Sequence, residues 1–111
     1  MTAGPSAETQ SDPIAELISE ALNTTREYPP HDRLVELDKL LREEIDRLST
    51  TARALAEQRP HRSRGWYALV NAVDVAEYAL GFQLGTSPLA AGLHVSELAR
   101  RVRELREVTA Q

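Results

Sequence analysis

The spacing of apolar residues constrains this chain more than any other feature. From residue 32 onward, apolar side chains recur almost only three and four positions apart, which is the period of helices that bury one stripe. No segment of comparable length shows the alternation that is typical of strands. The pattern is clearest in two stripes: Leu34, Leu37, Leu41, Ile45, Leu48, Ala52 and Leu55, and then Ala91, Val95, Leu98, Val102 and Leu105. The sequence therefore predicts an all-α fold, a small helical bundle.

Helix-start signals divide the chain into a tail and one domain. Residues 1–11 show no hydrophobic periodicity, and we expect a disordered tail there. Residues 12–111 then form a single helical bundle domain, whose size supports one small core. Asp12-Pro13 and Ser87-Pro88 each combine a capping side chain with proline at the first helical position. Both pairs indicate the start of a helix.

We expect three long antiparallel helices and one short N-terminal helix that packs over them as a lid. The ranges are 12–25, 32–57, 66–84 and 87–108, with Asp32 capping the second helix and Gly85 stopping the third. The stripe of the second helix is longer than the first helix can cover, so we expect a homodimer that buries part of the second or fourth helix. The predicted core contains Leu41, Ile45, Leu48, Val73, Leu98 and Val102.

Composition argues against several classes of function. The formal net charge is -4, whereas nucleic-acid binding depends on phosphate contacts and needs a basic field. The chain has no cysteine, which excludes disulfides, thiolate metal sites and a cysteine nucleophile. No apolar run approaches the roughly 20 residues that a membrane span requires. We expect a cytoplasmic protein with no membrane association, no cofactor and no metal.

Five residues form the candidate ligand-binding set. Tyr67, Asn71, Asp74 and Tyr78 fall at helical spacing and share one face of the third helix. Two phenols, an amide and a carboxylate on one face can line a pocket, with Asp74 as acid or base. His94 on the last helix is the fifth residue, and a half-buried histidine there commonly bonds a carbonyl or a carboxylate. The spacing of the four also describes the solvated side of an amphipathic helix, which we favour.

Arginines form a second candidate set. Arg59, Arg62 and Arg64 lie together between the second and third helices and form a candidate basic patch. More arginines follow near the C-terminal end of the last helix, where positive charge suits the helix dipole: Arg100, Arg101, Arg103 and Arg106. A continuous basic surface joining the two groups would favour a nucleic-acid-associated factor.

Two regions of the chain suggest a family. Pro29-Pro30, followed by residues 34–37 and 40–45, resembles a group of small actinobacterial proteins of unknown function, catalogued as natural product biosynthesis proteins. Residues 85–89 and 98–100 extend the likeness, which covers about residues 28–108. The chain departs from that group where many members carry a histidine near Glu44, a proline after Leu48 and a C-terminal His-Tyr. The resemblance implies a helical accessory protein encoded near specialised-metabolite genes, and it implies no reaction and no site residues.

Three functions from different classes follow from these observations. The first is a non-catalytic helical interaction or regulatory protein, acting through a protein partner or as a homodimer. The second is a small-molecule-binding protein or minor enzyme that uses the polar face of the third helix. The third is a nucleic-acid-associated factor that uses the arginines. We favour the first, because long apolar stripes dominate the chain and few residues suit catalysis.

Overall fold

Every element that the structure describes is a helix. The structure is a computed structural model, and it describes residues 12–110. Its helices are α2 (Pro13–Leu22), α3 (Thr24–Glu27), α4 (His31–Glu57), α5 (Arg64–Leu80) and α6 (Pro88–Thr109). The predicted all-α fold is confirmed for this part of the chain. The expected tail, residues 1–11, lies outside the described residues.

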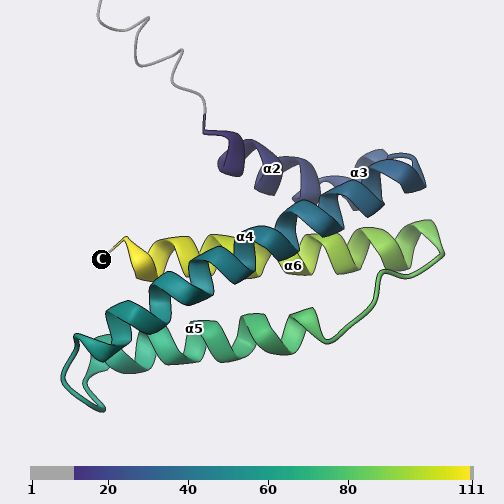
Figure 1. The fold of residues 1–111 in the computed structure, drawn as a ribbon. Coiled ribbons are helices and arrows are strands. Elements are labelled where there is room, and N and C mark those ends of the chain that lie inside the picture. The colour runs from purple at the N-terminus through teal and green to yellow at the C-terminus, as the bar shows by residue number, and fades with distance from the viewer. Residues whose placement is uncertain (1–11, 111) are drawn as a thin grey trace, which may run out of the picture.

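The other helices are arranged around α6. It contacts α2, α3, α4 and α5, and α4 and α5 also contact each other. In Figure 1, α4 crosses α6 obliquely, and α5 runs in the opposite direction to both. The same view shows α2 and α5 on opposite sides of α6. Because α2 contacts α3, α4 and α6 but not α5, the prediction that the first helix covers all three long helices is wrong.

Hydrogen bonds at the helix starts agree with two of the capping signals. The Asp12 carboxylate accepts from the backbone N–H groups of the second and third residues of α2, both at 3.1 Å. The Ser87 hydroxyl accepts from the third residue of α6, and Ser63 caps α5 in the same way. α4 begins directly after Pro30 without a side-chain cap. Asp32 therefore lies inside its first turn, and the prediction that Asp32 caps this helix is wrong.

The end of α5 differs from the prediction. The helix stops at Leu80 rather than Leu84, and Gly81 rather than Gly85 occupies the position after the last turn. The Arg42 guanidinium of α4 donates to the Leu80 carbonyl at 2.8 Å. This contact satisfies an acceptor that the helix end leaves open. The point at which α5 stops is therefore supported from a neighbouring helix, which periodicity within α5 cannot show.

Gly92 allows α3 to approach the backbone of α6. A Cβ atom at this position would lie 3.3 Å from Cγ2 of Thr25 and 3.4 Å from Oγ1 of Thr24. The buried Thr24 hydroxyl lies 3.0 Å from the Gly92 carbonyl oxygen, within hydrogen-bonding distance. A side chain at position 92 would press against this contact. Glycine lowers the helix propensity at this position, but it allows α3 and α6 to make a close contact.

Ion pairs attach α2 to the long helices. Arg33 of α4 binds the Glu20 carboxylate with two nitrogens, at 2.6 and 2.5 Å. Arg106 of α6 pairs with Asp12, the residue that caps α2. The hydrogen bond from Arg33 lowers the pKa of the Glu20 carboxyl, and the hydrogen bond from Arg106 lowers the pKa of Asp12. Both carboxylates therefore stabilise the fold in the charged form.

The predicted core is confirmed. The six predicted residues are all buried, with 5% exposure or less: Leu41, Ile45, Leu48, Val73, Leu98 and Val102. The stripe along α4 is buried from Leu34 to Ala52 and partly buried at Leu55, and the helix contacts α6 and α5 of the same chain. The stripe is therefore covered within one molecule. The length of the stripe therefore does not by itself require a second copy, and the homodimer stays a prediction.

Candidate functional site

The four polar residues predicted on the third helix lie on an open face of α5. Tyr67, Asn71, Asp74 and Tyr78 are all exposed, Tyr78 by 73%. The Tyr78 ring packs edge-on against Phe82, with centroids 5.2 Å apart. The residues do share one face, as their spacing predicts. The side chains on this face are solvated rather than enclosed.

His94 belongs to a different group of residues, which joins α6 to α4. Its Nε2 atom lies 2.8 Å from Oδ1 of Asp38, and its side chain is only 9% exposed. A carboxylate oxygen only accepts, so we assign the Nε2 proton to this hydrogen bond. The prediction that His94 is partly buried and bonds a carbonyl or a carboxylate is confirmed.

Arg42 extends this group to a third helix. Its Nε donates to Oδ1 of Asp38 at 3.0 Å, and its two terminal nitrogens donate to the carbonyls of Leu80 and Phe82 at the end of α5. One of these nitrogens also lies 3.3 Å from Nε2 of His94. We call Asp38, Arg42 and His94 the interhelical joint. The joint connects α4 to the end of α5 and to α6, through contacts between residues 38 and 56 positions apart in the sequence.

The joint is built for structure rather than for proton transfer. A general base needs a lone pair within reach of substrate, whereas the His94 ring, which Asp38 binds through Nε2, is almost fully covered. The guanidinium of Arg42 donates hydrogen bonds to one carboxylate and two backbone carbonyls. The joint therefore attaches α4, α5 and α6 to one another. His94 was a predicted site residue but its partners were not, because Asp38 and Arg42 resemble an ordinary surface pair of one helix.

The candidate basic patch lies where α4 connects to α5. Arg62 and Arg64 are exposed, and Arg62 has a left-handed backbone conformation with φ of 65°. Near the end of α6, Arg101 lies 3.3 Å from both Glu97 and Glu104, in two ion pairs. Acidic side chains thus accompany the arginines of α6. Such alternation weakens the long-range positive field that phosphate binding requires.

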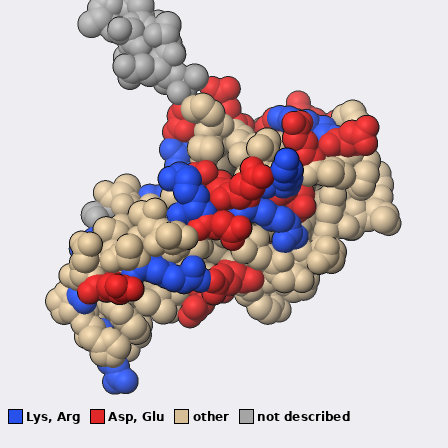
Figure 2. All heavy atoms as spheres, viewed as in Figure 1, with Lys and Arg blue, Asp and Glu red and all other residues tan. Residues whose placement is uncertain are grey.

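One segment stands out because it carries no charge. Residues 78–96 contain no Asp, Glu, Lys or Arg, and we call them the uncharged segment. Four large apolar side chains in it are exposed by 52 to 73%: Tyr78, Phe82, Leu89 and Leu93. Figure 1 places the connector between α5 and α6 at the right-hand end of the molecule, and Figure 2 shows few charged side chains on the lower part of that end. This surface was not among the predicted sites, although the absence of charge is visible in the sequence.

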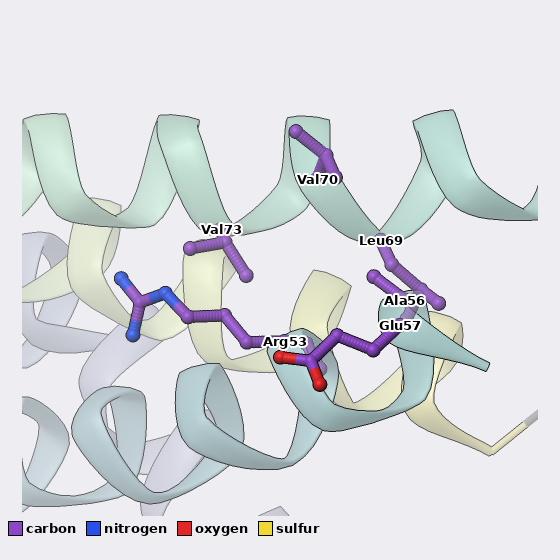
Figure 3. A pocket seen from close by; sticks show the side chains of 7 residues that line it. Arg53, Ala56, Glu57, Leu69, Val70 and Val73 are labelled. Carbon is purple, nitrogen blue, oxygen red and sulfur yellow. The ribbon is translucent and has the colours of Figure 1, made fainter. Parts of the chain in front are cut away.

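A cleft lies between α4 and α5. It has a volume of about 290 Å³ and is lined by Ala52, Arg53, Ala56, Glu57, Leu69, Val70 and Val73. In Figure 3, Leu69 and Val73 point from α5 toward α4, and the side chains of Arg53 and Glu57 extend from α4 beside them. We call this the α4–α5 cleft. It has an apolar floor and a charged rim, and none of its residues was among the predicted site residues.

Between residues 12 and 110, no group of three His, Asp or Glu side chains is arranged to hold a metal ion. Over the same range, no helix has the length and apolar character needed to cross a membrane.

Comparison with known proteins identifies the family. A family model described as a family of unknown function, DUF6415, matches residues 12–111. Neither the curated proteins nor the solved structures contain a match to the chain. The match spans the whole helical domain, including the joint, the uncharged segment and the cleft. The chain therefore belongs to the DUF6415 family, whose function is unknown.

Proposed function

We propose that this protein is a non-catalytic helical interaction module that forms a homodimer through its uncharged segment. The observation that carries the proposal is the exposure of Tyr78, Phe82, Leu89 and Leu93 within residues 78–96, which contain no charged side chain. Charged residues make up 27% of the whole chain, so their absence here is a local property. The Tyr78 and Phe82 rings are in contact, and exposed apolar side chains on an uncharged surface are typical of interaction sites.

A second copy of the chain suits this surface for an electrostatic reason. Two identical molecules of net charge -4 repel each other, and a symmetric interface places each surface against itself. A surface without charge avoids direct repulsion between like groups. Leu89 and Leu93 are one helical turn apart on α6, so they form a short apolar ridge that can pack against its own copy.

The size of the apolar contribution indicates a weak dimer. Four side chains that are about half exposed would each contribute about 1 kcal/mol on burial, or about 8 kcal/mol for two copies. Association costs about 4–15 kcal/mol in lost translational and rotational freedom. The balance favours a dimer that dissociates on dilution. An obligate dimer would need a larger apolar interface.

Sedimentation equilibrium of matched variants tests this proposal. The double variant Phe82→Asp/Leu93→Asp places charge on the proposed interface and should remain at the monomer mass of 12.3 kDa. The control Val35→Asp adds a charge at a 48% exposed position of α4, outside the uncharged segment, and should dimerise as the natural chain does. If the natural chain remained monomeric up to about 1 mM, the proposal would be contradicted. At that concentration, only dimers with an association free energy weaker than about 4 kcal/mol would go undetected.

We extend the proposal to the biological setting that the resemblance implies. The module would act in the cytoplasm of an actinobacterium, as an accessory protein of specialised-metabolite biosynthesis. The likeness of residues 28–108 to small helical proteins of that kind supports this setting. Deleting the gene and comparing metabolite profiles tests it: loss of one specialised metabolite is expected, and an unchanged profile argues against the setting. Complementation with the Phe82→Asp/Leu93→Asp variant then shows whether the role requires the uncharged segment.

A further inference from the structure

We propose that the α4–α5 cleft binds a small amphipathic amine, a molecule that combines a compact apolar group with a protonated nitrogen. The cleft is a different surface from the uncharged segment, and its residues come from α4 and the first half of α5. The inference therefore does not depend on dimerisation. It rests on the shape of the cleft floor and on the charges at its rim.

The floor of the cleft results from small side chains on α4. The stripe of this helix changes from Leu41, Ile45 and Leu48 to Ala52 and Ala56 as it passes α5. The missing volume leaves a hollow of about 290 Å³ whose walls include Leu69 and Val73. A closed apolar cavity of about 150 Å³ already accommodates benzene. A single aromatic ring with a short chain therefore fits the hollow.

The charges at the rim favour a cation. Arg53 forms an ion pair with Glu77 of α5, so its charge is matched within the protein. Glu57 lines the cleft and has no ion pair or hydrogen bond from its side chain among the described residues. Arg53 and Glu57 are the charged residues that line the cleft. Because Glu77 neutralises Arg53 from outside this lining, the charge of Glu57 is left unmatched. A protonated amine beside Glu57 would complete the charge balance, and an anion would have to compete with Glu77 for Arg53.

Three probes of nearly equal size test the charge and the shape separately. They are 2-phenylethylamine, the neutral 2-phenylethanol and the anionic phenylacetate, each titrated into the full ¹⁵N-labelled chain at pH 7. The amine should shift the amide resonances of residues 69–73 and bind about two- to fivefold more tightly than the alcohol, as an exposed ion pair allows. Phenylacetate should bind most weakly.

Two matched variants test whether Glu57 causes the preference for the amine over the alcohol. Glu57→Gln removes the charge and keeps the shape, so the amine and the alcohol should then bind equally. Glu43→Gln makes the same change at an exposed position 14 residues earlier in α4, about 21 Å away along the helix, and should leave the preference intact. Ala56→Leu fills the hollow and should weaken all three probes, with a thermal melt to confirm that the variant is folded.

The outcomes that would overturn the inference are specific. Binding of phenylacetate as tight as that of the amine would show that Arg53 or the nearby connector arginines dominate the rim. Resonance shifts confined to residues outside α4 and α5 would place the probe elsewhere. Absence of shifts with all three probes up to about 10 mM, a concentration that detects even very weak ligands, would show that the cleft is an unoccupied feature of packing.

Discussion

Removing the Arg42 side chain should destabilise the protein far more than removing an exposed arginine of the same helix. Arg42 contacts Asp38 and the carbonyls of Leu80 and Phe82, and its side chain is 27% exposed. In Arg42→Ala, water would replace only part of the hydrogen bonding that the Asp38 carboxylate and the two carbonyls lose. The Asp38 carboxylate, 18% exposed, would keep only His94 as a partner, and the end of α5 would lose a bound cation.

The expected magnitude follows from the three lost contacts. Hydrogen bonds that involve a charged group contribute about 1.5–3 kcal/mol each when they are buried. Partial exposure of the Arg42 side chain reduces each contribution to roughly half, and a cation at a helix C-terminus adds about 0.3–1 kcal/mol. We therefore expect the free energy of unfolding to fall by about 2.5–5.5 kcal/mol. A domain of this size has only about 5–15 kcal/mol in total, so the loss is large.

Arg53→Ala is the matched control, and urea unfolding followed by circular dichroism is the assay. Arg53 also lies on α4 and also forms an ion pair, with Glu77, but both side chains are about half exposed. Such a pair contributes about 0–1 kcal/mol. The two substitutions remove the same aliphatic stem, so their difference reports on the joint. A difference below about 0.5 kcal/mol at equal denaturant dependence would refute the assigned role of Arg42.

Four further predictions test the core, a close contact, the exposed face and an ion pair. Leu98→Ala removes a fully buried side chain and should cost about 2–5 kcal/mol in urea unfolding; an unchanged midpoint would mean that the stripe faces solvent. Gly85→Ala should lower the melting temperature through a loss of about 1–3 kcal/mol, because the added Cβ would lie 2.8 Å from a Cβ in the first turn of α6. Asp74→Asn should alter stability by less than about 0.5 kcal/mol, because the side chain is exposed; a larger loss would reveal a structural partner. Arg33 lowers the pKa of the Glu20 carboxyl below the ordinary 4.5. The ion pair between them therefore stabilises the fold fully above pH 4.5, and this stabilisation is lost as the pH falls through the lowered pKa. In Glu20→Gln, the free energy of unfolding should depend less on pH over this acidic range.

Local signals in the sequence determined which segments are helical and which side chains form the core. Helix starts at Asp12 and Ser87 depend on a side chain and on backbone groups two or three residues away, so neighbouring residues suffice to predict them. The stripe residues are buried because a helix brings every third or fourth residue to the same side. The prediction from neighbouring residues was wrong at Asp32, because α4 starts directly after Pro30 without a side-chain cap.

The tertiary structure alone decided which helix faces each stripe, and with it the interhelical joint and the α4–α5 cleft. His94 is 56 residues from Asp38, and no spacing rule within one helix predicts their hydrogen bond. The α4–α5 cleft exists because the small side chains of Ala52 and Ala56 line the same space as Leu69 and Val73 of α5, which depends on how the two helices cross. Periodicity shows that a residue is buried but not what buries it, since the relative placement of helices results from many weak contacts between distant parts of the chain.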